Sequence, residues 1–180
     1  MGKRPVLTFS HVGIWVTDLE GMREFYTDVL GFVHTDRGLV GDTELVFLSQ
    51  NPSDHHQLVL ARGRPRDLGF TTVNQISYKV DSLETLKDVY AEIRHKPVKE
   101  LVQISHGNAW SIYFKDPEGN RIELFVDTPW YTPQPCREAL DLTKPADEIR
   151  RDTEAYCRNQ PRFQNHADWQ RDLGDKIASR

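Results

Sequence analysis

Apolar and polar residues follow the same order in two blocks of this chain. The first block reads SHVGIWVTDLEGM at 10–22, and the second reads NQISYKVDSLETL 64 positions later, at 74–86. In each block an apolar stretch typical of a strand leads into an acidic turn typical of a helix start. Strands are therefore predicted at 5–17 and 71–80. One position changes its chemistry between the copies, because His11 in the first corresponds to Gln75 in the second.

A helix is predicted after each of these strands. Thr17 and Glu20 have the spacing of a capping box, and so do Asp81 and Glu84 in the second copy. Apolar residues then recur at helical spacing on one stripe: Met22, Phe25, Tyr26 and Val29 in the first copy, and Leu83, Leu86, Tyr90 and Ile93 in the second. Gly31 stands where a glycine commonly ends a helix.

Three further strands are predicted in each copy, at 32–37, 43–49 and 54–61, and at 99–105, 109–115 and 120–126. The stretch 62–70 has the composition of a linker, and 116–120 is a turn. The prediction is an α+β fold with paired βαβββ modules, 5–63 and 70–127, in one domain spanning 5–127. Because the strands are apolar on both faces, the modules are expected to join as one curved mixed sheet around a shared cavity, with helices outside.

The C-terminal tail, 128–180, has a different character. TPWYTPQP is rich in proline, and polar helices are predicted at about 146–157 and 166–177. This tail is expected to be an arm that packs over its own module or over a partner subunit. Both interpretations stay open at this stage.

Composition limits the classes of function. The chain has 180 residues, 38% of them hydrophobic, and a net charge of −4 spread along its length. Nothing indicates a nucleic-acid or anionic-lipid partner, and no apolar run approaches the ~20 residues that span a bilayer. No apolar segment follows MGKRP, so a cytoplasmic protein is expected, with Cys136 and Cys157 as free thiols.

Three side chains are candidates for a metal site. His11 and Gln75 occupy equivalent positions, which should face one another across a shared cavity. Glu123 lies between Ile122 and Leu124, and a buried carboxylate is costly unless it is paired or bound to metal. The three together suit a divalent ion such as Fe(II), Mn(II), Zn(II) or Ni(II). Taken singly, His11 could be an ordinary core or edge histidine, and Glu123 could pair with Arg121.

The segments SHVGIWVTDLEGMREFYTDVLGF and YFKDPEGNRIELFVDTPWY resemble the vicinal oxygen chelate superfamily. This group includes glyoxalase I, fosfomycin- and bleomycin-resistance proteins, and extradiol ring-cleaving dioxygenases. The resemblance implies paired βαβββ modules around a metal, with His11, Gln75 and Glu123 as its ligands. Many members have histidine where this chain has Gln75, while glutamine ligands occur in glyoxalase I.

Within the superfamily, three features resemble the extradiol dioxygenase branch. The doublet His55-His56 resembles the pair in which that branch keeps its acid–base histidine, with His56 favoured and His55 as the rival. Tyr113 matches a tyrosine near the substrate, and His106 stands where polar residues line the pocket. Alternation along the predicted strand would turn His55 and His56 to opposite sides, so an inward His56 could instead be a fourth ligand.

The resemblance thus implies a ferrous dioxygenase that cleaves the ring of a catechol-like aromatic. Two alternatives stay open: a glyoxalase-like isomerase or lyase on a vicinal-oxygen substrate, and a metal-free protein that sequesters a flat ligand, as bleomycin-resistance relatives do. The expected partners are a small molecule and further copies of the chain, as a homodimer or larger assembly.

Overall fold

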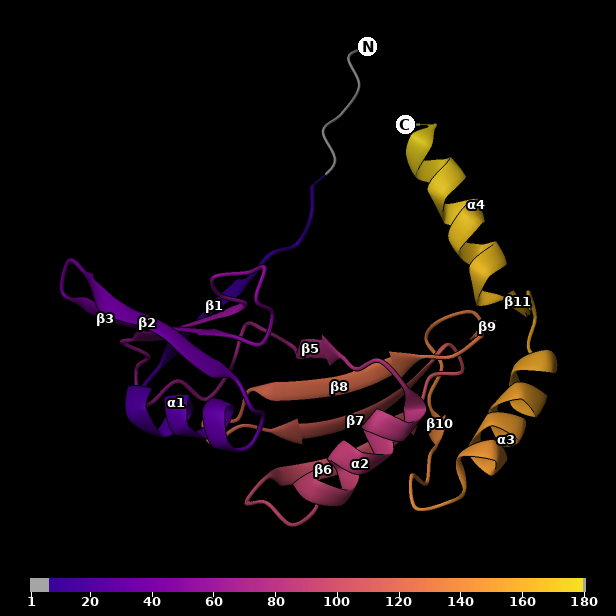
Figure 1. Cartoon of the computed structure of the whole chain (residues 1–180), viewed down its shortest axis with the longest axis horizontal. Coiled ribbons are helices and arrows are strands. Elements are labelled where there is room, and N and C mark those ends of the chain that lie inside the picture. The colour runs from indigo at the N-terminus through magenta and orange to yellow at the C-terminus, as the bar shows by residue number, and fades with distance from the viewer. Residues whose placement is uncertain (1–6, 180) are drawn as a thin grey trace. The chain divides into compact units, whose positions relative to one another are not determined.

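A computed structural model describes residues 7–179 and divides the chain into two compact units (Figure 1). The first unit consists of two segments, the chain up to Asn74 and the turn Lys115–Asn120. The second contains Gln75–Phe114 and the chain from Arg121 onward. The start of the first predicted strand, at 5 and 6, lies outside the described residues.

The first unit is a four-stranded sheet with one helix. Its strands follow the order β1-β4-β3-β2, with β1 parallel to β4 and the other neighbours antiparallel. The elements are β1 (Val12–Val16), α1 (Leu19–Asp28), β2 (Val33–Val40), β3 (Thr43–Ser49) and β4 (Leu58–Arg62). Helix α1 buries Leu19, Met22, Phe25 and Tyr26. The last three belong to the predicted stripe, whose fourth member, Val29, is the C-cap of the helix.

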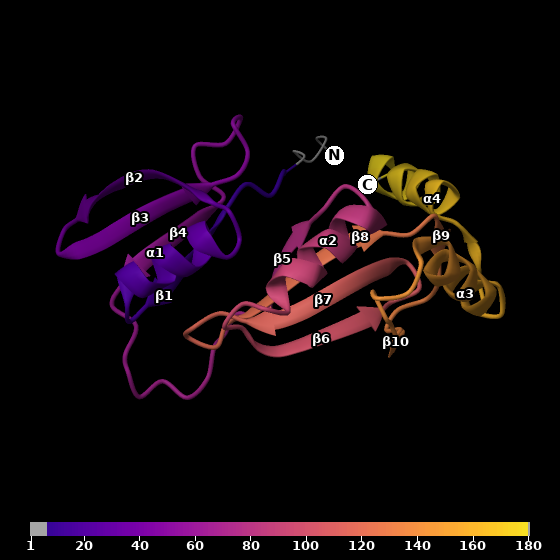
Figure 2. The same cartoon turned by 60° about the horizontal axis from the view of Figure 1, so that its bottom comes forward.

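The second unit repeats this arrangement and adds the tail. Its main sheet has the order β10-β6-β7-β8-β5, and Figure 2 shows α2 across one face of it. The elements are β5 (Ile76–Lys79), α2 (Leu83–Ile93), β6 (Lys99–Ser105), β7 (Ala109–Lys115), β8 (Arg121–Asp127), β9 (Trp130–Tyr131), β10 (Glu138–Ala139), α3 (Ala146–Arg158), β11 (Gln164–Asn165) and α4 (His166–Ala178).

Strand register confirms that the two modules are copies. Val12 pairs with Leu58 in the first unit, and Ile76 pairs with Ile122 in the second, so both members of the pair recur at the 64-residue offset. The parallel β1–β4 pair thus corresponds to the parallel β5–β8 pair. The predicted α+β class with paired βαβββ modules is confirmed.

Several predicted strands begin too early. Strand β1 starts at Val12 and β5 at Ile76, so His11 and Gln75 each lie immediately before the first strand of a module. Strand β4 starts at Leu58 rather than at 54, because the turn after β3 is longer than predicted. The Asn51 side chain donates to Asp54 Oδ2 at 2.7 Å, and the Ser49 hydroxyl donates to the Asp54 carbonyl at 2.9 Å.

The helix caps lie one residue later than the capping-box spacing predicts. Asp18 caps α1 by accepting from the Gly21 N–H at 3.1 Å, and Ser82 caps α2 by accepting from the Thr85 N–H at 3.0 Å. Both caps directly precede the buried leucine that opens the helix, so the carboxylate or hydroxyl reaches the free N–H groups of the first turn. The predicted caps Thr17 and Asp81 were wrong.

The tail is part of the second unit. Helix α3 buries Ile149, Thr153 and Cys157, and the Trp110 indole N–H donates to the Thr153 hydroxyl at 2.8 Å. Of the two interpretations of the tail, packing on its own module is therefore correct for α3. Both predicted thiols are free and buried, and burial raises the pKa of Cys157 to about 11. Across residues 7–179, the helices are too short or too polar to cross a membrane.

Candidate functional site

Glu123 is at the centre of a hydrogen-bond network in the second unit. It lies on β8 directly opposite Ser77 on β5, and only 7% of it is exposed. Its Oε2 accepts from the Ser77 hydroxyl at 2.6 Å and from the Gln75 amide Nε2 at 2.8 Å, while its Oε1 accepts from the Tyr113 hydroxyl. We call Gln75, Ser77, His106, Tyr113 and Glu123 the carboxylate network. It meets the requirement that a buried carboxylate be hydrogen-bonded.

Tyr113 stays protonated in this setting. Burial, followed by the adjacent Glu123 carboxylate, raises the pKa of the Tyr113 hydroxyl far above its usual value. The hydroxyl is therefore a permanent donor to Glu123. Its oxygen lies 2.8 Å from Nε2 of His106, which extends the network by one imidazole.

Both ring nitrogens of His106 face a polar group. Nδ1 lies 2.6 Å from the Cys136 carbonyl, which can only accept, so Nδ1 is the donor of this hydrogen bond. Nε2 faces the Tyr113 oxygen, and the Tyr113 hydroxyl donates to Glu123. The imidazole, the phenol and the carboxylate thus form one continuous row of polar groups.

Residues of the tail hold the loop that carries His106. The Gln134 amide donates to the His106 carbonyl at 2.8 Å, and the Thr128 hydroxyl donates to the Gly107 carbonyl at 2.6 Å. Gly107 adopts a φ of +71°, in the left-handed region that favours glycine. Because glycine has no Cβ, the tail can also approach closely here. A Cβ at this position would lie 2.6 Å from Oγ1 of Thr132 and 3.3 Å from Sγ of Cys157. The tail thus fixes the backbone on which the imidazole is mounted.

We expect Gly107→Ala to destabilise the protein by about 2–4 kcal/mol, because left-handed strain adds to overpacking against buried neighbours. Gly119→Ala is the matched control, since Gly119 has a φ of +83° with nothing within 4 Å of the added Cβ. The control should cost only the backbone strain, about 1–2 kcal/mol. Urea denaturation followed by circular dichroism measures both. Equal losses of unfolding free energy in the two variants would show that the tail is not in close contact with this loop.

The first unit contains a separate histidine cluster made of His11, His55 and His56 with Phe47. The rings of His11 and His56 lie 4.3 Å apart, edge to face, and Nδ1 of His55 is 3.0 Å from Nδ1 of His56. His55 and His56 are in the loop before β4, so the strand alternation expected to separate them does not apply. Their side chains are neighbours.

His56 differs electrostatically from an exposed histidine. Partial burial lowers its pKa, and the neighbouring His11 and His55 lower it further. The ring therefore stays neutral to a lower pH than usual, which is the state a general base requires. His55 instead lies 3.7 Å from the Asp36 carboxylate and is largely exposed.

The structure thus distributes the predicted residues over two clusters. Gln75, His106, Tyr113 and Glu123 come together in the second unit, and His11, His55 and His56 come together in the first. Within residues 7–179, no group of three or more His, Cys, Asp or Glu side chains is arranged to hold a metal. A metal at Gln75 and Glu123 would take one carboxylate and one amide from the second unit.

Sequence reasoning missed one member of the carboxylate network and one group that orients it. Ser77 stands two positions after Gln75, and residues at that spacing share one face of a strand, so this signal was available. The Cys136 carbonyl that orients His106 was not predictable, because it comes from an irregular segment 30 residues away.

Two βαβββ modules, each with a polar side chain directly before its first strand, define the class of this protein. The model of the Glyoxalase/Bleomycin resistance protein/Dioxygenase superfamily matches residues 8–124. The chain belongs to this superfamily.

Two curated relatives from Rhodococcus globerulus are similar over 123 residues. Biphenyl-2,3-diol 1,2-dioxygenase 2 is 30% identical and biphenyl-2,3-diol 1,2-dioxygenase 3 is 28% identical, each match covering 66% of this chain. The matched segment spans 62% of the length of either relative.

Solved structures share the fold. A glyoxylase/bleomycin resistance protein/dioxygenase domain from Frankia sp. EAN1pec has a TM-score of 0.59 at 21% identity, covering 69% of this chain and all of that one. A mutant of fosfomycin resistance protein FosX from Listeria monocytogenes, complexed with Mn(II) and 1S,2S-dihydroxypropylphosphonic acid, has a TM-score of 0.55 at 20% identity, covering 69% and 95%. At these identities the likeness concerns the fold alone.

Proposed function

We propose that this chain is a divalent-metal-dependent, extradiol-type dioxygenase that opens the ring of a catechol-like aromatic. The observation that carries the proposal is the carboxylate network, in which Tyr113 forms hydrogen bonds with both Glu123 and His106. The similarity to two biphenyl-2,3-diol dioxygenases supports the substrate class. Fe(II) is the metal that this class of reaction implies.

The donor types of the network fit a divalent ion. In the structure the Gln75 amide directs its Nε2 to Oε2 of Glu123 at 2.8 Å. With the amide turned so that its oxygen faces the site, the two residues would offer oxygen ligands that Mn(II), Fe(II) and Zn(II) accept. We propose His11 of the first unit as the third ligand. When bound, the metal would hold the two adjacent oxygens of a catechol and lower the cost of removing their protons.

The chain's own residues would manage those protons. His56, neutral because its pKa is lowered, is the proposed base for a substrate hydroxyl, with His55 as the alternative. Tyr113 keeps its proton because its pKa is raised, so it would not act as the base. To orient an oxygen of the substrate, its hydroxyl would turn from Glu123 to that oxygen. His106, held by the tail, would line the pocket and keep Tyr113 in place.

One observation favours a second function. The amide of Gln75 stands where many superfamily members have histidine, and glutamine ligands are found in glyoxalase I. An amide oxygen binds more weakly than imidazole to metals such as iron, which suits a metal used only as a Lewis acid. A glyoxalase-like isomerase or lyase is therefore the second candidate.

Metal analysis and oxygen uptake separate the candidates. Protein purified without chelators is analysed for bound metal, then incubated with Fe(II) and biphenyl-2,3-diol in an oxygen electrode. We expect oxygen uptake and a ring-opened product that contains both atoms of O₂. Bound zinc, nickel or manganese without oxygen uptake would favour the second candidate. Protein that binds none of these metals would contradict both and leave a ligand-sequestering role.

The Gln75→His variant tests the metal assignment directly. Exchanging the amide for imidazole should increase affinity for Fe(II) or Zn(II) by about 10–100-fold, because imidazole is the stronger ligand for these ions. Calorimetric titration measures the change. Gln160→His, two residues after the last residue of α3, is the matched control for a histidine added outside the site. The same affinity in both variants and in the parent protein would remove Gln75 from the ligand set.

A further inference from the structure

Helix α4 begins against its own unit and ends without neighbours. At its first turn, the Trp169 ring stacks on Tyr131 of β9 with centroids 5.2 Å apart and an angle of 11° between planes. Beyond that point the helix stands clear of the other elements of its unit (Figure 1). No residue of α4 is buried. A 13-residue helix is marginal in water by itself, so its far half lacks the packing that usually stabilises such an element.

An apolar stripe continues along this uncovered half. Trp169, Leu173 and Ile177 recur every fourth residue, which places them on one face. Leu173 is 39% exposed and Ile177 is 58% exposed. Rows of residues four apart form the ridges that interlock when two helices pack. Trp169 already contacts Tyr131, so Leu173 and Ile177 form the exposed part of this ridge.

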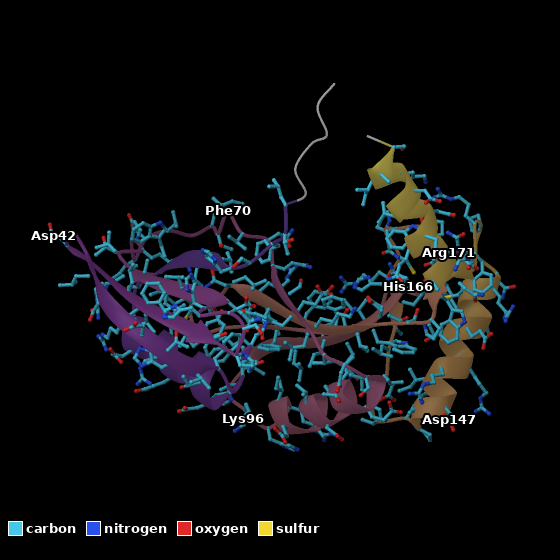
Figure 3. The ribbon with its side chains drawn as sticks, turned by 45° about the horizontal axis from the view of Figure 1, so that its top comes forward. Asp42, Phe70, Lys96, Asp147, His166 and Arg171 are labelled. Carbon is cyan, nitrogen blue, oxygen red and sulfur yellow. The ribbon has the colours of Figure 1, made fainter. Side chains whose placement is uncertain are left out.

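A row of opposite charges runs beside the stripe. Asp172 and Lys176 are one position before Leu173 and Ile177, and neither forms an ion pair within the described part of the chain. The ion pair that α4 does contain, Arg171 with Asp168, lies on the other side of the helix; Figure 3 labels Arg171 and His166 along α4. Asp172 and Lys176 are thus available to an incoming surface.

The charged pair is symmetric about Gly174, and we infer from this pattern that α4 pairs antiparallel with α4 of a second copy of this chain. Reversing the helix about Gly174 brings Asp172 of one copy level with Lys176 of the other, twice in the dimer. The same reversal places Leu173 between Leu173 and Ile177 of the other copy, as ridges require when they interlock. A groove of about 320 Å³ lies between α4 and Tyr131, Phe163 and Arg162, and Leu173 is one of the residues that line it.

The contact is small, so the dimer is weak. Two helices of this length cover less area than the ~1,200 Å² typical of stable complexes, so we expect a transient dimer with a dissociation constant on the order of 1–100 μM. Sedimentation velocity of the full chain across this concentration range should show a monomer–dimer equilibrium. Leu173→Glu should weaken it at least tenfold with an unchanged circular dichroism spectrum. Leu68→Glu, at an exposed leucine of the first unit, is the matched control and should leave the equilibrium unchanged.

Charge reversal tests the antiparallel register. Asp172→Lys places lysine beside Lys176 of the other copy, and Lys176→Glu places glutamate beside Asp172, so each variant alone should dimerise several-fold more weakly. An equimolar mixture of the two should dimerise as well as the parent protein, because both pairs are then opposite in charge. Charge effects inside one helix persist on mixing, so the recovery reports contact between copies.

A parent chain that stays monomeric up to about 100 μM would overturn the inference. So would a dimer that Leu173→Glu does not weaken, which would place the contact elsewhere. A mixture that fails to recover would overturn the antiparallel arrangement. None of these results depends on bound metal or on catalysis, so the test is independent of the proposed function.

Discussion

We expect the Glu123→Gln variant to lose at least about 100-fold in affinity for a divalent metal, and with it any metal-dependent activity. The substitution keeps the shape of a side chain that is 7% exposed but removes its charge. It also replaces one acceptor oxygen by a donor, although Ser77, Gln75 and Tyr113 all donate to this group. At least one buried donor would then have no acceptor, at a cost to folding of about 1–3 kcal/mol.

Calorimetric titration with Mn(II), and with Fe(II) under anaerobic conditions, measures the affinity. Ser77→Ala is the matched control: it deletes one donor to the same carboxylate and leaves the charge in place, so metal affinity should fall by only about tenfold. Thermal unfolding of the metal-free proteins separates folding from binding. Unchanged metal affinity in Glu123→Gln would contradict the assignment of Glu123 as a ligand, whatever its effect on stability.

The second large effect is expected at Glu118, a residue with no proposed part in chemistry. Its Oε1 accepts from the N–H groups of Thr17 and Asp18 at 2.7 and 2.8 Å, at the start of α1. Its Oε2 lies 3.6 Å from the Arg64 guanidinium, and both side chains are only 12% exposed. A carboxylate at a helix N-terminus satisfies free donors and complements the helix dipole.

Glu118→Ala should therefore lower the free energy of unfolding by about 3–5 kcal/mol, since it removes the acceptor of two backbone donors and the charge that faces Arg64. Glu118→Gln keeps one acceptor oxygen and should cost less, about 1–2 kcal/mol. Glu154→Ala removes an exposed ion pair with Arg158 and should stay within about 0.5 kcal/mol of the parent protein. Chemical denaturation measures all three. A Glu118→Ala loss as small as that of Glu154→Ala would show that the turn does not stabilise α1.

This result would change the interpretation of the segment DPEGN. In the sequence it is a turn and part of the resemblance to the superfamily. In the structure Asp116 is buried and accepts from the Tyr26 hydroxyl at 3.2 Å and from the Asn120 amide at 2.8 Å. Burial raises the pKa of the Asp116 carboxyl, although these donors oppose the shift. The segment is thus a structural connection within the first unit, and its resemblance to the family reflects folding.

The sequence by itself determined the elements and their duplication. The apolar stripe Met22, Phe25, Tyr26 predicted α1, and the 64-residue offset between copies recurs in the register of both parallel strand pairs. These features depend on residues close together in the chain, for which helical and strand periodicities are sufficient. The same offset identified His11 and Gln75 as equivalent positions, each one residue before a strand.

Tertiary structure decided what the polar side chains contact. The doublet His55-His56 lies outside the predicted strand, because side-chain hydrogen bonds lengthen the turn that precedes the strand. His106 is oriented by a carbonyl 30 residues away. Glu118 accepts hydrogen bonds from the start of a helix that begins about 100 residues earlier. Such contacts depend on which distant segments pack together, and local patterns carry no information about that pairing.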